Sequence, residues 1–422
     1  MGKLLCVVSC PIDCYAGYGG RARDIVKELL KNYPEWDIRV LSQRWGQCRM
    51  GYLEDHKEAE LAGHIISNLT EKPDIWIQIT VPNEFQPVGK FNIGITAGIE
   101  TTACDASWVE GCNRMNLIIT SSKHGKFSLD NTRYQKKGYS GFLEVKTPIE
   151  ILFEGVDKKV YKTLKQKHSL LSSVDTNWNF LVVGHWLPGD FGHDRKNIGY
   201  TIKAFLEAFK DYKGPGSCPG LILKTSTRGC SSITDQREIL NRIYNIRESV
   251  AYKDSLPNIY VLHGDLSDQE INELYNDPKV KVMISFTKGE GYGRPLAEFA
   301  SIGKPILCSG WSGQLDFLNK EYVALIGGTL EKVHPSAAVE GMILPETSWF
   351  KPDDNQVLAG LKELYKYYSF WLDKAKKEAK IISSEFSLEK MGEKLKEILD
   401  RNLPVFPEKV ELNLPDISEM FD

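Results

Sequence analysis

The segment "MISFTKGEGYGRPLAEFASIGKPIL", from Met283 to Leu307, places two glutamates, Glu290 and Glu298, on either side of a glycine-rich turn. The apolar run before the turn predicts a buried parallel strand, and Pro295 stands where proline commonly begins a helix. The helical spacing that follows ends at Gly303, before another short apolar run. The segment therefore predicts a strand, a glycine loop, a helix and a second strand of a parallel α/β sheet.

This glycine loop suits an anionic ligand, because the first turn of a helix leaves backbone N–H groups unpaired. Carboxylates next to a phosphate are unfavourable unless they bind something else, and they accept hydrogen bonds well from hydroxyl groups. A ligand that combines phosphates with hydroxyls is a nucleotide sugar. For either glutamate taken alone, a solvated surface acid is the simpler interpretation.

The composition is that of a globular protein with room for two or three domains, since 26% of the 422 residues are charged and 42% are hydrophobic. No apolar run approaches the roughly 20 residues of a membrane helix, and "MGKLLCVVSC" does not have the build of a signal peptide. The nine cysteines are scattered, which favours reduced thiols and a cytoplasmic location. We interpret Cys6, Cys10 and Cys14 as core thiols rather than metal ligands.

The net charge of −3 argues against indiscriminate binding to nucleic acid. One segment differs: Arg114 to Lys167 contains twelve Lys or Arg and five Asp or Glu, an excess of seven positive charges. A solvated face explains such an excess, and an anionic acceptor would also use it. The end of the chain, from Glu408 to Asp422, is acidic and is expected to be loosely held.

Strand and helix patterns alternate in two series, which predicts two parallel sheets covered by helices. The expected strands are "KLLCVVS", "DIRVLS", "DIWIQIT", "KFNIGIT" and "NLIITS" in the first series, and "NFLVVGH", "GLILKTS", "NIYVLHG", "KVMISF" and "KPILCS" in the second. Helices are expected over Arg21–Asn32, His56–Leu69, Asp354–Ser384 and Ser387–Asn402. The predicted fold is an α/β fold with two Rossmann-like α/β/α domains that face a central cleft.

A polar, irregular stretch near Thr163–Asn177 is expected to link the two domains. The predicted division is an N-terminal domain at 1–165, a C-terminal domain at 166–384, a helix at 385–402 that packs back on the N-terminal domain, and an acidic tail at 403–422.

The first glycine loop, "AGYGGRA", matches a dinucleotide fingerprint only formally. Six residues separate it from the preceding strand, and the next strand ends "RVLSQR" without the acid that would hold a ribose. Gly19 and Gly20 are nevertheless predicted to let the backbone approach a donor ligand.

The charge of a leaving diphosphate must be met by side chains and helix N-termini, because the chain has neither a Walker A pattern nor an Asp-x-Asp pair for a metal ion. Arg195 and Lys196 precede a predicted helix, and Lys224 ends a predicted strand. These three cations are expected to point toward the cleft, whereas Arg228 is interpreted as solvated.

The segment "GEGYGRPLAEFASIGKPIL" resembles the Glu-x7-Glu motif of the large family of retaining glycosyltransferases with the GT-B architecture, of the group 1 or family 4 type. Other parts align with that family in order: "AGYGG", "IETTACDASWVEGCNRMNLIITSS", "FEGVDKKVY", "DRKNIG" and "GWSGQLDFL". The resemblance spans most of residues 1–320. The chain also looks like glycosyltransferases of tailed bacteriophages, some of which modify hydroxymethylated bases in DNA.

The resemblance implies a role for individual residues. Glu290 would contact the hydroxyls of the donor sugar, Glu298 would contact the ribose, and Lys196 would bind the diphosphate. The family arginine normally follows the "VVG" strand, where this chain has His185 and Trp186, so Arg195 is expected to replace it. The other residues that the resemblance places near the donor are Glu100, beside the reacting carbon, and Gly291, Tyr292, Gly293 and Arg294.

The implied reaction transfers a sugar from a nucleoside diphosphate to an acceptor hydroxyl with retention of configuration, without a metal ion or another cofactor. The specific acceptor we expect is a hydroxymethylated DNA base, in the host cytoplasm if a phage encodes the protein; a saccharide or a surface glycan is the alternative. Two other classes stay open: a non-hydrolysing sugar-nucleotide epimerase, and a nucleotide-sugar binding protein without catalysis.

Overall fold

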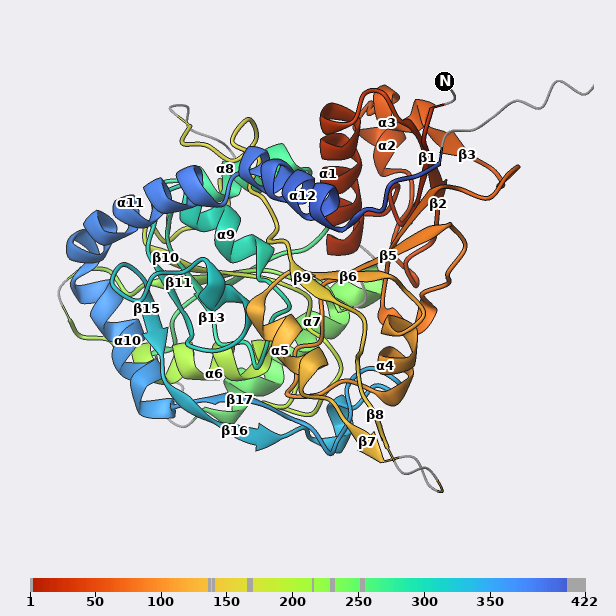
Figure 1. Cartoon of the computed structure of the whole chain (residues 1–422). Coiled ribbons are helices and arrows are strands. Elements are labelled where there is room, and N and C mark those ends of the chain that lie inside the picture. The colour runs from red at the N-terminus through yellow and green to blue at the C-terminus, as the bar shows by residue number, and fades with distance from the viewer. Residues whose placement is uncertain are drawn as a thin grey trace, which may run out of the picture.

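The computed structural model describes residues 3–135, 138, 141–164, 170–214, 216–227, 232–250 and 255–407. They form two parallel sheets, each with helices packed against it, and the chain passes from one sheet to the other and finally back (Figure 1). Within these ranges no helix is both long and apolar enough to cross a lipid bilayer.

The first sheet has the strand order β3-β2-β1-β4-β5-β6-β9, and every pairing in it is parallel. Its central strands are buried, which explains their continuous apolar sequence. The strands are β1 (Leu5–Cys10), β2 (Asp37–Ser42), β3 (Ile65–Ile66), β4 (Ile75–Ile79), β5 (Phe91–Thr96), β6 (Leu117–Thr120) and β9 (Ile149–Ile151). All five strands expected for the first series are confirmed within one or two residues.

The helices of this half depart from the sequence prediction in two places. The first, α1 (Gly17–Asn32), begins at Gly17 rather than Arg21 and takes in the glycine loop. The helix predicted over His56–Leu69 is wrong: this range holds one short turn, α3 (Ala59–Gly63), and then strand β3, while the turn α2 (Tyr52–Asp55) ends just before it. Pairing of β3 with β2 satisfies backbone groups that a helix would have bonded internally, so sheet formation overrides the helical pattern.

The remaining elements of this half are short. They are the 3-10 turn η1 (Pro82–Glu84), α4 (Ala106–Cys112), α5 (Lys123–Asp130), and the small hairpin of β7 (Tyr134–Gln135) and β8 (Phe142–Leu143).

The second sheet has the order β12-β11-β10-β13-β14-β15 and is also parallel throughout. Its strands are β10 (Asn179–Val183), β11 (Gly220–Lys224), β12 (Ile259–Leu262), β13 (Val280–Ser285), β14 (Ile306–Ser309) and β15 (Ala324–Ile326). The helices beside it are α6 (Ile198–Phe209), α7 (Ile233–Ser249), α8 (Asp268–Asn276), α9 (Arg294–Ser301), α10 (Asp354–Lys366) and α11 (Tyr368–Glu385). The strand, glycine loop, helix and strand predicted at Met283–Leu307 are therefore confirmed as β13, the loop, α9 and β14.

A segment after β15 forms a small unit of its own. Strands β16 (Gly328–Lys332) and β17 (Ser348–Pro352) pair antiparallel, and the turn η4 (Pro335–Ala337) lies in the loop between them. Val333, Ala337 and Trp349 make a separate buried cluster there. The strand and helix patterns did not predict this unit, because its side chains do not alternate regularly.

The last helix, α12 (Leu388–Asn402), returns to the first half of the chain and packs against α1 (Figure 1). Its apolar side chains Met391, Leu395 and Ile398 belong to the same buried cluster as strands β1 and β2. Phe153 contacts Phe386 at the start of this return, with ring centroids 5.2 Å apart.

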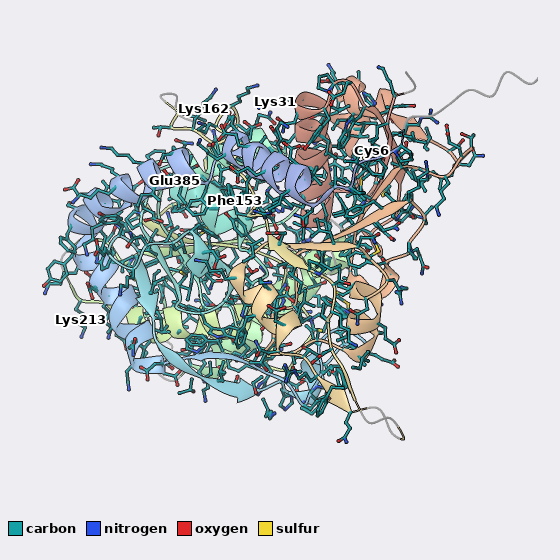
Figure 2. The ribbon with its side chains drawn as sticks, viewed as in Figure 1. Cys6, Lys31, Phe153, Lys162, Lys213 and Glu385 are labelled. Carbon is teal, nitrogen blue, oxygen red and sulfur yellow. The ribbon has the colours of Figure 1, made fainter. Side chains whose placement is uncertain are left out.

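The cysteines singled out in the sequence, Cys6, Cys10 and Cys14, are buried and free, as core thiols are. In Figure 2, Cys6 lies inside the first half of the molecule, whereas Lys31 and Lys162 lie at its periphery.

The excess of positive charge in Arg114–Lys167 is distributed over separate elements. Lys162 lies far from the β7–β8 hairpin, which begins directly after Arg133 (Figures 1 and 2). Arg133 pairs with Glu144 at 3.2 Å, and Arg114 donates to the backbone carbonyls of Phe85 and Asn83. Part of this charge is therefore used within the protein. Lys136, Lys137, Lys165 and Lys167 of this segment lie outside the described residues, as do Arg228 and the tail after 407.

Candidate active site

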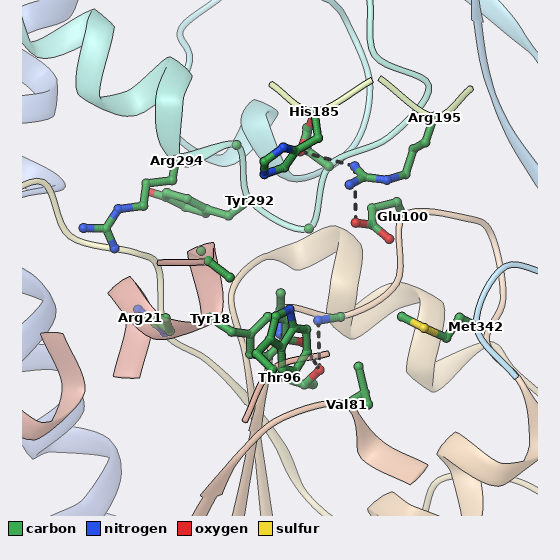
Figure 3. A pocket seen from close by; sticks show the side chains of 18 of the residues that line it. Tyr18, Arg21, Val81, Thr96, Glu100, His185, Arg195, Tyr292, Arg294 and Met342 are labelled. Atoms are coloured by element: carbon green, nitrogen blue, oxygen red, sulfur yellow. Dashed lines mark hydrogen bonds and ion pairs between the residues drawn. The ribbon is translucent and has the colours of Figure 1, made fainter. Parts of the chain in front are cut away.

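A cavity of about 480 Å³ lies between the two halves, at the carboxyl ends of strands from both sheets (Figure 3). This is the place where open parallel sheets usually bind ligands, and the volume is within the roughly 300–1,000 Å³ of small-molecule sites. The first half contributes Gly17, Tyr18, Arg21, Trp45, Val81, Thr96, Glu100, Trp108 and Glu154, among others. The second half contributes His185, Arg195, Glu290, Gly291, Tyr292, Gly293, Arg294, Met342 and Ile343, among others.

Two cations and two carboxylates form one ion-pair cluster where the two halves meet, with Glu100 from the first half and the other three side chains from the second. The Nζ atom of Lys196 donates to both carboxylate oxygens of Glu290, at 2.6 and 2.7 Å. Arg195 lies 3.4 Å from Glu290 and 3.2 Å from Glu100, so it joins the two halves of the chain. The cluster carries two positive and two negative charges and is nearly buried, with side-chain exposures between 9% and 22%.

The pKa values of the cluster follow from burial and charge. Burial alone would raise the pKa of Glu290, but Lys196 and Arg195 outweigh this effect and hold it below the usual value. Burial lowers the pKa of Lys196, and the Glu290 carboxylate opposes that shift. Glu290 is therefore ionised at neutral pH and forms an ion pair with the lysine.

The turn before α6 places Arg195 in the wall of the cavity and Lys196 behind it, against Glu290. Asn197 has a left-handed backbone (φ 57°), and its side-chain amide donates to the carbonyl of Phe286, after β13. Asp194 accepts a hydrogen bond from the N–H of Ile198 and so closes the turn. This conformation costs energy for a residue other than glycine, and the hydrogen bonds offset that cost.

The glycine loop before α9 packs directly on the first half of the chain. A Cβ atom added to Gly291 would lie 2.6 Å from the carbonyl oxygen of Ala97, and one added to Gly289 would lie 2.2 Å from that of Glu100. Gly293 has φ 103° and precedes the helix. The loop therefore needs glycines both for its conformation and for close contact between the two halves.

Glu298, the second glutamate of the motif, is buried beneath Arg294 rather than open to the cavity. The Nε atom of Arg294 lies 2.9 Å from Glu298, and its terminal nitrogen lies 2.6 Å from Asp24 of α1. Burial raises the pKa of Glu298 to about 7. Arg294 thus bridges the two halves, and it pairs with the Glu298 carboxylate, which by the family resemblance would bind a ribose.

Four other predicted site residues also lie away from the lining of this cavity. Lys196 borders a small gap on the far side of Glu290, and Lys224 donates to the carbonyl of Gly264 at 2.6 Å. Gly19 packs against the backbone of Cys14, and a Cβ atom added to Gly19 would lie 2.0 Å from the carbonyl oxygen of Cys14. Gly20 faces the side chain of Arg294. Gly17 and Tyr18 line the cavity in their place.

Most of the wall made by the first half consists of residues that the sequence patterns did not predict as site residues. Tyr18 and Trp45 stack with ring centroids 4.0 Å apart, and Trp108 lies on α4. Trp45 carries a usable signal, since it is a large aromatic residue just after the carboxyl end of a predicted strand. No comparable signal marks Met342 and Ile343, which reach the cavity from the β16–β17 unit.

His185, the residue at the position of the family arginine, does line the cavity. Its Nδ1 atom lies 2.8 Å from the Ser226 hydroxyl. Burial, together with Lys196 and Lys224, lowers its pKa, so the imidazole is neutral. Within the described ranges no group of three or more His, Cys, Asp or Glu side chains has the arrangement of a metal site.

The architecture is GT-B: two Rossmann-like α/β domains with a cleft between them. No protein-family model matches the sequence, and no curated protein sequence does. Solved structures match it in fold over almost the whole chain. HepE from Anabaena, in complex with UDP and glucose, is 13% identical with a TM-score of 0.59, covering 94% of this chain and 100% of that one.

Two further structures give the same result. Sucrose-phosphate synthase from Thermosynechococcus elongatus is 12% identical with a TM-score of 0.60, covering 95% of this chain and 99% of the other. A glycosyltransferase from Rickettsia africae is 14% identical with a TM-score of 0.61, covering 96% and 100%. At these identities the likeness establishes the fold, and the activity of this chain is a separate inference.

Proposed function

We propose that this protein transfers a sugar from a nucleoside-diphosphate sugar to an acceptor hydroxyl, with retention of configuration and without a metal ion. The observation that carries the proposal is the cluster of Lys196, Arg195 and Glu290 beside the glycine loop and the N-terminus of α9. Proteins of the same fold with bound UDP and glucose add support.

In this proposal Lys196 and Arg195 bind the diphosphate. A diphosphate carries more negative charge than one carboxylate, so its arrival draws Lys196 away from Glu290. The freed carboxylate then accepts hydrogen bonds from hydroxyls of the donor sugar. The negative charge that develops on the leaving diphosphate is stabilised by the two cations, whose side chains are already held in a nearly buried position.

Glu100 lies on the other side of Arg195, at the end of the segment that follows β5. A carboxylate there would stabilise positive charge that develops on the anomeric carbon of the donor. Glu298 would bind the ribose only after Arg294 turns away from it, because Arg294 now holds that carboxylate.

As the acceptor we propose the hydroxymethylated DNA base that the sequence resemblance suggests, because aromatic rings line the half of the cavity opposite the cations. The scattered positions of the basic residues in Arg114–Lys167 give this acceptor little electrostatic help, so a saccharide or surface glycan is tested beside it.

The test has two stages. Thermal-shift assays with UDP-, GDP- and ADP-glucose identify the donor, since a ligand that binds the native state raises its melting temperature. Release of nucleoside diphosphate is then followed with duplex DNA containing 5-hydroxymethylcytosine and with maltose as acceptors. The Lys196→Ala variant should lose activity, while Lys213→Ala, which changes an exposed lysine of the same half, should not.

The same assays would identify either of the two alternative classes, an epimerase or a binding protein without catalysis. Conversion of the sugar nucleotide to its epimer without an acceptor would identify an epimerase. Binding of a donor without release of nucleoside diphosphate, for every donor and acceptor tried, would identify a binding protein. Either result would overturn the transferase proposal.

A further inference from the structure

Two cysteines, Cys14 and Cys48, contact each other beside the cavity. Cys14 lies between β1 and α1, and Cys48 lies between β2 and α2. These two segments run side by side, because Cys14 pairs with Met50 in an antiparallel bridge and the N–H of Tyr15 donates to a carbonyl one residue earlier, at 3.1 Å. The thiols of Cys14 and Cys48 form a hydrogen bond. Cys14 is buried, whereas Cys48 is half-buried and lines the cavity, so a small solute in the cavity reaches the pair.

The thiol of Cys14 differs in its surroundings from that of Cys10, four residues earlier. The Cys14 sulfur accepts a hydrogen bond from the N–H of Ala16 at 3.4 Å, at the N-terminus of α1. The guanidinium of Arg23 donates to the carbonyl of Cys14 at 2.8 Å and so lies close to the sulfur. The hydrogen bond from the Cys48 thiol, with these two groups, lowers the pKa of Cys14 to about 7, whereas burial raises the pKa of Cys10 to about 12. Cys14 is therefore partly ionised at neutral pH, and the thiolate is the reactive form of cysteine.

The segment that carries Cys48 also carries Trp45, whose ring stacks on Tyr18 in the cavity wall with centroids 4.0 Å apart. The N–H of Cys48 donates to the carbonyl of Trp45 at 3.0 Å, so the two residues belong to one turn and move together. Tyr18 is held from the other side: its hydroxyl accepts the N–H of Ala97 at 3.0 Å and lies 3.1 Å from the hydroxyl of Thr96 (Figure 3). A displacement of Cys48 therefore changes the contact between the two rings.

We propose that Cys14 and Cys48 form a reversible disulfide with hydrogen peroxide as the oxidant, and that this bond displaces Trp45 from Tyr18. A disulfide holds its two sulfurs about 2.0 Å apart, closer than two thiols joined by a hydrogen bond. Its formation therefore draws the turn of Trp45 and Cys48 toward α1. Sugar transfer then slows, because the wall opposite the cations loses its flat aromatic surface; this consequence rests on the function proposed above.

The reaction proceeds in two steps through a sulfenic acid. In the first, the Cys14 thiolate takes the proton of the Cys48 thiol while the Cys48 sulfur attacks one oxygen of the peroxide, whose O–O bond breaks to leave hydroxide. In the second, the Cys14 sulfur attacks the sulfur of the Cys48 sulfenic acid, the S–S bond forms, and the S–O bond breaks to release water with the Cys14 proton. The hydroxide takes up the proton that Cys14 released when it ionised. The two sulfurs together lose two electrons, and one peroxide is reduced to two waters.

Peptide mapping by mass spectrometry tests the bond directly. The full chain is treated with a small excess of hydrogen peroxide, the remaining thiols are blocked with iodoacetamide, and the protein is digested without reductant. The wild type should yield two peptides joined through Cys14 and Cys48, and the Cys48→Ser variant should not. Cys218→Ser is the matched control, because Cys218 is also half-buried but its thiol contacts the carbonyl of Phe209 at 3.8 Å. This control should form the bond as the wild type does.

Tryptophan fluorescence reports the displacement of the Trp45 ring without any substrate. Oxidation should change the emission of the wild type, and dithiothreitol should reverse the change. Neither Cys48→Ser, which lacks the bond, nor Trp45→Phe, which lacks the reporting ring, should show it. Sugar transfer by the oxidised wild type should fall roughly three- to tenfold, the range expected when one aromatic contact is lost, and should recover with dithiothreitol. Peroxide treatment should leave the transfer rate of Cys48→Ser unchanged.

Oxidation of Cys14 or Cys48 to sulfinic or sulfonic acid, or to disulfides with other cysteines, in place of the joined pair would overturn the proposal. A joined pair without the change in Trp45 emission, or with a full transfer rate, would also overturn it. A protein that transfers no sugar even when reduced would count against the transferase function instead, and peptide mapping and fluorescence would still decide whether the disulfide forms and displaces the ring.

Discussion

Replacing Lys196 with methionine removes the closer of the two cations that hold the Glu290 carboxylate. The Nζ atom lies within 2.7 Å of both carboxylate oxygens, in a nearly buried site. Breaking a buried ion pair by removing one partner costs about 3–5 kcal/mol, because the remaining charge is left unpaired. Arg195 stays 3.4 Å from Glu290, so we expect a loss near the lower limit, about 3 kcal/mol.

For a domain of this size such a loss lowers the melting temperature by roughly 6–12 °C. Binding of nucleoside diphosphate should also weaken, since Lys196 is proposed to contact it. Loss of one charge-assisted hydrogen bond is worth about 1.5–3 kcal/mol, which corresponds to a dissociation constant roughly 10- to 150-fold higher. Differential scanning calorimetry measures the first effect, and isothermal titration calorimetry at a temperature well below both melting points measures the second.

The double variant Lys196→Met/Glu290→Gln separates stability from function. Glutamine leaves no unpaired charge, so most of the melting temperature should return. Nucleoside diphosphate binding should stay weak, because the cation is still missing. Wild-type affinity in Lys196→Met, or recovery of affinity together with stability in the double variant, would refute the proposed contact between Lys196 and the diphosphate.

Three further predictions follow from the same contacts. Glu298→Gln should weaken nucleoside diphosphate binding and raise the donor KM. Glu290→Gln should leave nucleoside diphosphate binding nearly unchanged and lower kcat. Calorimetry that finds equal effects of the two variants on nucleoside diphosphate binding would contradict the proposal that Glu298 binds the ribose and Glu290 the donor sugar. Burial raises the pKa of Glu378 from 4.5 to about 7, and its Oε2 atom has no partner in the described part of the chain. The free energy of unfolding should therefore fall as the pH rises from 4.5 to 7, because the folded protein must then bury an ionised carboxylate. Urea unfolding should show that Glu378→Gln stabilises the protein more at about pH 8 than at about pH 5, and an equal gain at both would contradict this. Transfer activity should be unchanged by EDTA, and its loss on chelation with recovery on adding Mg²⁺ would contradict the metal-free mechanism.

The sequence predicted correctly those strands and helices whose pattern of apolar residues matches their burial in the folded protein. Strands such as β1 and β13 are buried on both faces, so their apolar runs were unambiguous. The prediction over His56–Leu69 failed because Ile65 and Ile66 gain a strand partner that a local pattern does not reveal. Three edge strands of the two large sheets, β3, β9 and β15, and the β16–β17 unit were not predicted, because their short sequences carry little periodicity.

The candidate site divides in a similar way. Glu290, Arg195, Lys196 and Glu100 were chosen from motif and strand-end positions, and the structure brings them together. The resemblance to a known family contributed to that choice. The aromatic wall was not found, since Tyr18, Trp45 and Trp108 are distant in sequence and share no motif.

The sequence by itself determined two parallel α/β sheets and a charged, glycine-rich loop, because strand burial, helix starts and glycine turns are set by residues close together in the chain. Tertiary structure alone decided what faces that loop. Arg294 reaches Asp24, Arg195 reaches Glu100, and the β16–β17 unit reaches the cavity only after the two sheets pack. Such contacts depend on the relative position of segments up to several hundred residues apart, and no local preference of the chain encodes that position.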